Sequence, residues 1–317
     1  MTDLTSVSNN LKSQKSVAII LHVRPDGDAI GSGLALFYAL KNIGIDAGVF
    51  CDDVIPERFD FILEKGLVKR AIDKDYDCVC FVDCADRYRS GSIYESVKAK
   101  KNTVNIDHHV SNDRYAKINY VCDLSSNCEN VYNLINEMGV TIDEKIANFL
   151  LMGVLTDTGN FQHKNVTDST LFVAGELVKK GADINKLSYH MFNAQSKARA
   201  MLFGKVMSKI RYFLDDRLAM IIVSNSDFAS TGAKREETEG FIDFIMGIDT
   251  VKVGVCISEM ENGTKKVSLR SKGPDVNAVA GTFGGGGHVL ASGCQLQGDV
   301  EEVVDKLRYV VSQYIDD

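Results

Sequence analysis

The sequence predicts an α/β fold in which an N-terminal, doubly wound parallel sheet is joined by a linker helix to a smaller α+β C-terminal domain. Three observations predict it. Short unbroken apolar runs, typical of strands buried on both faces, alternate with helical patterns up to residue 107. After a long helical stretch the pattern returns to strands, with Asn262-Gly263 as a strong hairpin signal. Finally, 317 residues are enough to bury two separate cores.

Four apolar runs are predicted to form the parallel sheet. The first occupies residues 17–21, and from Ala29 onwards the apolar period is that of a helix. A helix between two strands is the connection that parallel pairing requires. The other predicted strands occupy residues 45–51, 77–83 and 103–107, with a polar helix around 93–101.

Beyond His109 the pattern is helical. The predicted helices cover residues 127–138, 143–155 and 168–180, and Gly181 ends the last of them. Residues 187–213 contain no proline and predict a helix that links two domains. We therefore expect a first domain at residues 1–190, a linker helix at 191–213 and a second domain at 214–317. In the second domain, strands are predicted at 218–223, 251–260, 265–270 and 289–296, and helices at 275–283 and 299–314.

The composition limits the class of protein. The net charge is −7, and neither the first 205 residues nor the remainder has an excess of basic side chains. A protein that tracks long nucleic acid normally presents a basic face, so a nucleotide ligand should be short. No apolar run approaches the ~20 residues that a spanning helix requires, and residues 1–15 lack the apolar core of a secretory signal. We expect a cytoplasmic protein without a membrane partner.

Side chains that bind metal ions follow four apolar runs. The first run ends in His22, Asp26 and Asp28, on the turn that leaves the carboxyl end of a strand. Open α/β sheets bind their ligands at this edge. In the alternative interpretation Asp28 caps the next helix and Asp26 is a turn residue, but a cap explains one run and not four. The other three runs end in Asp83, in Asp107-His108-His109 and in Asp157.

The predicted ligands are two imidazoles and four carboxylates, namely His22, Asp26, Asp28, Asp83, His108 and Asp157. This mixture suits manganese or magnesium, and the lack of a thiolate argues against structural zinc. Four carboxylates exceed what one catalytic ion needs, but they match two ions ~3.5–4 Å apart that share a ligand. Asp83, at the end of a central strand, is the candidate bridge.

Two such ions define the predicted reaction. They lower the pKa of a water molecule, which attacks phosphorus as hydroxide, and they neutralise charge on the phosphoryl oxygens. The sequence therefore predicts phosphoester hydrolysis. Asp107 is available to orient a ligand histidine, and His109 to contact the phosphate or protonate the leaving group. The alternative for His109 is a core histidine whose partners are backbone groups.

The second domain contains a candidate substrate clamp. Arg270 and Ser271 end a predicted hairpin strand, and the arginine fork suits a phosphate or carboxylate. The glycine run 284–287 before His288, which includes Gly285, Gly286 and Gly287, lets backbone N–H groups approach a phosphate closely. The alternative for this run is a flexible hinge. We expect these residues to face the metal site across an interdomain cleft.

With these motifs the chain resembles the DHH phosphoesterases, in the branch with a DHH-associated C-terminal domain. The motifs occur in the family's order over nearly the whole chain: His22-x-x-x-Asp-x-Asp28, Val82-Asp83, Asp107-His-His109, Thr156-Asp157-Thr-Gly159, and Arg270-Ser with Gly284-Gly-Gly-Gly-His288. The resemblance implies that one manganese ion is held by His22, Asp26 and Asp83. The other would be held by Asp28, Asp83, His108 and Asp157. Arg270, the glycine run and His288 would bind the nucleotide end of the substrate.

Within this family the compact chain resembles enzymes that degrade very short RNA and also remove the 3′-phosphate of adenosine 3′,5′-bisphosphate (pAp). The leading hypothesis is thus a manganese-dependent exonuclease for short oligoribonucleotides with pAp phosphatase activity. The enzymatic alternative is a phosphodiesterase for cyclic di-AMP or pApA, while an inorganic pyrophosphatase fits the glycine run less well. A nucleotide-binding regulator with a silent metal site is the non-enzymatic alternative. The resemblance also suggests a homodimer.

Overall fold

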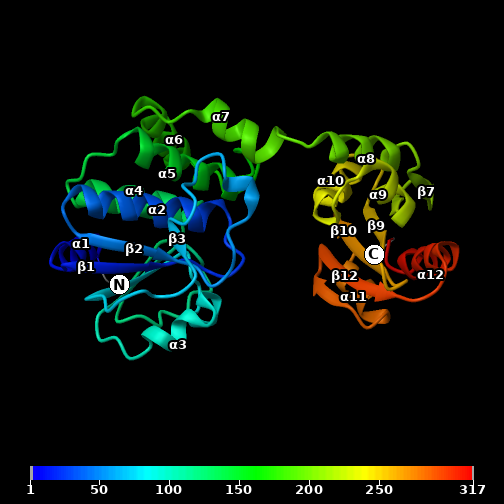
Figure 1. Ribbon diagram of the computed structural model, residues 1–317. Coiled ribbons are helices and arrows are strands. Elements are labelled where there is room, and N and C mark those ends of the chain that lie inside the picture. Colours follow the sequence, from blue (N-terminus) through cyan, green and yellow to red (C-terminus); the bar gives the residue numbers. More distant parts are fainter. Residues whose placement is uncertain (1–2, 316–317) are drawn as a thin grey trace. The chain divides into compact units, whose positions relative to one another are not determined.

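The computed structural model describes residues 3–315, which form two units (Figure 1). The first unit runs to Ala194 and the second begins at Gln195. Within residues 3–315, no helix has both the length and the apolar character needed to cross a membrane.

The first unit contains a six-stranded sheet in which every neighbouring pair is parallel, in the order β3-β2-β1-β4-β5-β6. This confirms the predicted doubly wound sheet. The two edge strands were not predicted, because they are short and partly exposed and so lack a continuous apolar run. The strands are β1 (Ser16–Ile20), β2 (Asp46–Phe50), β3 (Val68–Lys69), β4 (Cys78–Val82), β5 (Thr103–Asp107) and β6 (Ile118–Val121).

Helices cover both faces of this sheet (Figure 1). On one face α2 and α4 pack against the strands, and α5 packs on α2. On the other face the short helix α3 covers a smaller cluster that includes Phe50 and Phe81. The helices are α1 (Leu4–Lys12), α2 (Gly27–Asn42), α3 (Ile93–Val97), α4 (Asn127–Glu137), α5 (Glu144–Asp157), α6 (Asp168–Lys179) and α7 (Ile184–Ser188).

Helices α2 and α5 approach each other closely because glycine lies at their contacts. A Cβ atom on Gly31 of α2 would lie 2.4 Å from the carbonyl oxygen of Phe149 in α5. A Cβ atom on Gly153 of α5 would lie 2.7 Å from Oδ1 of Asp28 and 2.2 Å from Sγ of Cys128. Any larger residue would therefore push the helices apart. This close approach brings Asp28 and the C-terminal end of α5 together.

The expected single helix over residues 187–213 is instead several shorter elements. After α7 the chain forms a π-helical turn at Tyr189–Asn193, and Ala194 is extended. Ser196 then begins the helix α8 (Lys197–Met207), since its side chain accepts the N–H of Arg199. Residues Arg211–Phe213 form the strand β7. Periodicity alone did not reveal these breaks because they contain neither proline nor glycine.

The second unit contains a mixed sheet with the order β11-β12-β10-β9-β8-β7. The pairs are antiparallel except for β8 with β9. One face packs against α11 and α12, and the other against α8, α9 and α10. The remaining elements are β8 (Leu218–Val223), α9 (Asn225–Thr231), α10 (Phe241–Met246), β9 (Val253–Glu259), β10 (Lys265–Ser271), α11 (Val276–Thr282), β11 (Gly286–His288), β12 (Ala291–Leu296) and α12 (Val300–Ser312).

Candidate metal centre

Three neighbouring strands deliver imidazoles and a carboxylate to one edge of the first sheet. His22 follows β1, Asp83 follows β4, and His108 follows β5. Because β1, β4 and β5 are adjacent and parallel, the residues after their carboxyl ends lie side by side. Asp83 leaves its strand with a φ of 57°, a left-handed conformation that is uncommon outside glycine and recurs at functional sites.

Two further carboxylates come from the start of α2, and both also stabilise helix ends. Asp26 is the N-cap of α2, where its side chain accepts the N–H groups of Asp28 and Ala29. Asp28 is fully buried and accepts the N–H groups of Asn127 and Cys128 at the start of α4. The capping alternative is therefore correct for Asp26 rather than for Asp28 on its own helix. In both residues one carboxylate serves a helix end and also faces the cluster.

Asp157 is the last residue of α5. It does not follow a strand, although the sequence predicts all six ligands at one edge of the sheet. The close contact of α5 with α2 carries it there. A carboxylate at a helix C-terminus faces the negative end of the helix dipole, which is unfavourable unless a cation is near. Its position beside His108 therefore favours a bound positive charge.

Asp83 lies between the two imidazoles. Its Oδ2 is 3.3 Å from Nε2 of His22, and its Oδ1 is 3.4 Å from Nε2 of His108. Oδ2 of Asp26 also lies near His22, 3.6 Å from the same Nε2. Oδ2 of Asp157 also lies near His108, 3.4 Å from its Nε2. The geometry therefore brings together all six ligands expected from the sequence, with Asp28 Oδ2 3.8 Å from His108 Nε2.

The backbone assigns a tautomer to each imidazole. Nδ1 of His22 lies 2.8 Å from the carbonyl oxygen of Val23, and Nδ1 of His108 lies 3.1 Å from that of Leu124. A carbonyl only accepts, so each Nδ1 carries the hydrogen and the lone pair of each neutral ring lies on Nε2. Each Nε2 lone pair then faces a carboxylate oxygen of Asp83: Oδ2 in the case of His22 and Oδ1 in the case of His108.

This arrangement fits divalent metal ions. Nε2 of His22 and Oδ1 of Asp83 are buried and have no hydrogen-bond partner within the described residues. Facing lone pairs repel unless a proton or a cation lies between them, and buried polar atoms are otherwise paired. Three overlapping groups have the spacing to hold an ion: His22-Asp26-Asp83, Asp28-His108-Asp157 and Asp83-His108-His109.

When no metal ion is bound, the cluster holds protons instead. Burial lowers the pKa of His22, but the hydrogen bonds and charges of Asp26 and Asp83 outweigh it and raise that pKa to about 10. A similar balance raises the pKa of His108 to about 10. Burial together with the neighbouring carboxylates raises the pKa of Asp157 to about 10. Metal binding must therefore displace protons at neutral pH.

Asp107 orients His109 and not the ligand histidine His108, which corrects one expectation from the sequence. Oδ1 of Asp107 lies 2.9 Å from Nδ1 of His109, and Oδ2 accepts a hydrogen bond of 2.6 Å from Asn112. The backbone carbonyl of Leu124 takes the orienting role at His108. His109 is partly exposed, so it is not a core histidine. Its Nδ1 also lies 3.6 Å from Oδ1 of Asp83, beside the cluster.

In the second unit, the predicted clamp residues lie along one row of the sheet. Arg270 in β10 and His288 in β11 are both paired with Ala291 in β12. Directly paired residues point to the same face, so the two side chains flank one methyl group. Ser271 is next to Arg270, and its Oγ accepts the N–H of Gly273 at 3.0 Å.

The glycine run is an ordered edge and not a flexible loop. Gly286 and Gly287 belong to β11, and Gly285 passes so close to β12 that a Cβ atom would lie 2.2 Å from the carbonyl oxygen of Gly293. The N–H of Gly287 donates a 2.8 Å hydrogen bond to Oδ1 of Asn277, so it is already engaged within the protein. These contacts argue against the flexible-hinge alternative.

Three residues beside the metal centre escaped the sequence analysis. Asn112 supports Asp107 from the loop after β5. Arg24 and Arg89 line a hollow of about 490 Å³ together with His22, Val23 and Asp26. Arg24 lies inside the first motif, and Arg89 follows Asp83 by six residues. Their proximity to strand ends is a signal that could have identified them.

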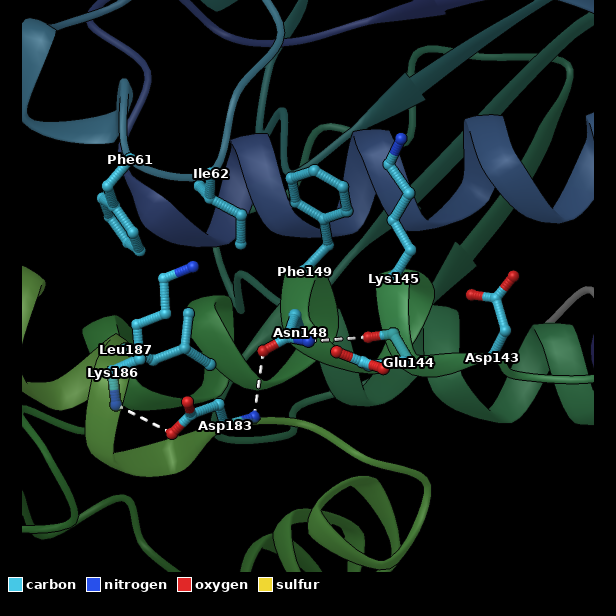
Figure 2. A pocket seen from close by; sticks show the side chains of 10 residues that line it. All are labelled: Phe61, Ile62, Asp143, Glu144, Lys145, Asn148, Phe149, Asp183, Lys186 and Leu187. Carbon is cyan, nitrogen blue, oxygen red and sulfur yellow. Dashed lines mark hydrogen bonds between the residues drawn. The ribbon is translucent and has the colours of Figure 1, made fainter.

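A larger cavity of about 560 Å³ lies around the opposite, N-terminal end of α5 (Figure 2). Its walls combine apolar side chains such as Phe61, Phe149 and Leu187 with charged and polar ones. Its polar groups bond to one another: Asn148 accepts the N–H of Asp183 and donates to the carbonyl of Glu144 (Figure 2). None of the predicted site residues lines it. The cavity therefore does not have the chemistry of the catalytic site.

A doubly wound sheet with imidazole and carboxylate ligands at its carboxyl edge is typical of a metal-binding α/β enzyme. Comparison with known proteins assigns the family. The model of the DHH family N-terminal domain matches residues 16–154, and the model of the DHHA1 domain matches residues 218–317. The chain therefore belongs to the DHH family, and it is a phosphoesterase.

Individual relatives match over both units. A protein from Thermus thermophilus named bifunctional oligoribonuclease and PAP phosphatase NrnA is 32% identical over 305 residues, which cover 94% of this chain and 89% of the relative. A probable manganese-dependent inorganic pyrophosphatase from Bacillus anthracis is 27% identical over 271 residues, covering 83% of this chain and 80% of the relative. The solved structure of an exopolyphosphatase-related protein from Bacteroides fragilis superposes with a TM-score of 0.85 at 26% identity, covering 99% of this chain and 96% of that one.

Proposed function

We propose that this phosphoesterase hydrolyses very short oligoribonucleotides to mononucleotides and removes the 3′-phosphate of pAp, with two manganese ions in its metal centre. The observation that carries the proposal is the pair of ligand groups that meet at Asp83. The similarity to the Thermus thermophilus relative over most of both chains supports the choice of substrates.

The chain's residues would divide between the two ions. His22, Asp26 and Asp83 would hold one, and Asp28, Asp83, His108 and Asp157 the other. When bound, the ions would activate a water molecule and neutralise charge on the phosphate. Magnesium is a second candidate, because imidazole and carboxylate suit both ions, but the imidazole content and the name of the Bacillus anthracis relative favour manganese.

His109 would serve the leaving group. Asp107 fixes its Nδ1, so Nε2 is left for the substrate. With Nδ1–H donated to Asp107, the ring can donate a proton from Nε2 only as an imidazolium. His109 would therefore protonate the oxygen that leaves phosphorus. In the second unit, Arg270 and Ser271, with His288 and the glycines of β11, would bind the nucleotide.

The test is a manganese-supplemented time course on separate samples of five-residue RNA, pAp, pApA, cyclic di-AMP and pyrophosphate, with products resolved by chromatography. We expect shortening of the RNA to mononucleotides and release of AMP from pAp. Asp83→Asn serves as the inactive control, and Asp168→Asn, an exposed carboxylate on α6, as the matched variant that keeps full activity.

Other outcomes would assign a different substrate to the same centre. Preferential loss of cyclic di-AMP or pApA, with the longer RNA intact, would make the enzyme a dinucleotide phosphodiesterase. Exclusive hydrolysis of pyrophosphate would agree with the name of the Bacillus anthracis relative instead. No hydrolysis of any nucleotide, with metal bound, would favour the regulator.

A further inference from the structure

Two guanidinium groups lie beside the metal centre without an acidic partner. Arg24 and Arg89 line the hollow next to His22 and Asp26. Within residues 3–315, neither side chain forms an ion pair with a carboxylate. Arg24 is exposed, but Arg89 is partly buried, and a partly buried cation without an anion is costly to hold unless a ligand supplies the opposite charge.

The backbone holds both arginines in place. Arg24 has a φ of 54°, a left-handed conformation, and its N–H donates a 2.8 Å hydrogen bond to Oδ2 of Asp53. The carbonyl oxygen of Arg89 accepts the N–H of Val23 at 2.6 Å, which ties the loop after β4 to the loop after β1. Arg89 also lies within a short helical turn, Arg87–Ser90, that Asp86 caps. The backbone at both positions is therefore held beside the hollow.

The guanidinium of Arg89 keeps its donors free. Its Nη2 lies 3.5 Å from Nδ1 of His22, but that nitrogen carries a hydrogen that it donates to Val23. Arg89 therefore approaches the ring without donating to it. It lies on the Nδ1 side, whereas Nε2 on the other side of the ring faces Asp26 and Asp83. One ring width separates the guanidinium from the metal-binding atoms.

We propose that this hollow binds a second phosphate group of the substrate, one that is not hydrolysed, with Arg89 as its main ligand and Arg24 at its rim. The inference rests on the proposed function, because it requires a nucleotide with more than one phosphate. The phosphate that reacts would lie on the Nε2 side of His22 at the metal ions. A phosphate one step away along the nucleotide would then lie beside the planar fork of Arg89.

Charge supports this division. The negative charge of the carboxylates in the centre would balance the positive charge of the metal ions, so no positive charge is left there to attract another anion. Asp26 borders the hollow and would repel a second phosphate unless cations faced it. Arg24 and Arg89, which line the same hollow, supply them. The hollow would therefore favour pAp or 5′-phosphorylated RNA over substrates with a single phosphate.

The test compares two substrates that share the same scissile phosphate. pAp carries a 5′-phosphate, and 3′-AMP lacks it. We expect Arg89→Ala to reduce the ratio of kcat/KM for pAp to kcat/KM for 3′-AMP about tenfold to a hundredfold, mainly through the KM for pAp. Arg89→Lys should recover part of the ratio, and Arg24→Ala should reduce it less because Arg24 is exposed.

Arg87→Ala is the matched control, because Arg87 is exposed on the same turn and does not line the hollow. It should leave the ratio unchanged. An equal loss on both substrates in Arg89→Ala, with manganese content intact, would show a general role at His22 and overturn the inference. An unchanged ratio would overturn it too. Failure of the proposed function is distinguishable, because the wild-type protein would then hydrolyse neither pAp nor short RNA, and the inference would fall with it.

Discussion

The two ends of helix α5 differ in how their polar groups are paired. At the N-terminal end, around the large cavity of Figure 2, Asn148, Asp183 and Glu144 bond to one another. At the C-terminal end, ~20 Å away at 1.5 Å per residue, Asp157 joins a cluster in which His22 and Asp83 retain unpaired buried atoms. We therefore place the proposed catalytic site at the smaller space. Buried polar atoms without a hydrogen-bond partner are therefore a better guide to the proposed site than the volume of a cavity.

The largest expected effect is on catalysis. Asp83→Ala should reduce hydrolysis by about a thousandfold or more, because both ligand groups lose their shared carboxylate. The fold should survive because the strand and its core remain, although His22 and His108 lose the carboxylate that raises their pKa values in the metal-free protein. Initial rates, with melting temperatures as the control for folding, check this. Activity similar to wild type would refute the dinuclear assignment.

The close packing of α2 on α5 offers the next test. Gly153→Ala should cost about 1–3 kcal/mol of unfolding free energy, because the new methyl group collides with Asp28 and Cys128. It should also weaken metal binding by displacing Asp28. Gly175→Ala on α6, where no atom lies within 4 Å of the added Cβ, is the matched control and should stabilise the protein by about 1 kcal/mol. Equal effects of the two variants in chemical denaturation would contradict the packing argument.

The unpaired cluster also predicts a pH dependence. The pKa of His22 is raised to about 10 in the folded metal-free protein, so its stabilising contribution is complete below the unfolded value near 6.5 and is lost as the pH rises towards 10. The raised pKa values of His108 and Asp157 act in the same direction. Manganese replaces the protons, so the gain in Tm on adding it should grow by several degrees between pH 6.5 and 9. A gain that is constant or falls with pH would contradict this account.

The smallest expected effect concerns the cavity of Figure 2. Asp183→Ala removes the N-cap of α7, whose side chain accepts the N–H of Lys186, and should cost about 0.5–2 kcal/mol of stability. Because these polar groups are paired within the protein, kcat and metal content should stay at wild-type values. Loss of metal-dependent activity in this variant, measured well below its Tm, would mean that the two ends of α5 are coupled.

The sequence predicted the parts of the site that depend on local pattern. Apolar runs that end in His22, Asp83 and His108 identify strand ends, and adjacent parallel strands bring such residues together. Asp157 is predicted as a ligand from its motif, but its position at a helix end depends on how α5 packs on α2. That packing is a long-range property, and local periodicity does not contain it.

Other features were missed for the same physical reason. Whether Asp107 contacts His108 or His109 depends on side-chain direction, which spacing does not specify. The run Gly286–His288 becomes a strand only because β12 offers it an edge. The edge strands β3 and β6 are too short to show a period. Pairing across the fold determines each of these features.

The central claim is that two ions share Asp83 at the carboxyl edge of the first sheet. Its most direct test is an anomalous difference map from crystals of the protein grown with manganese. We predict two peaks, one among His22, Asp26 and Asp83 and the other among Asp28, Asp83, His108 and Asp157. A single peak, or peaks that do not have Asp83 in common, would contradict the account.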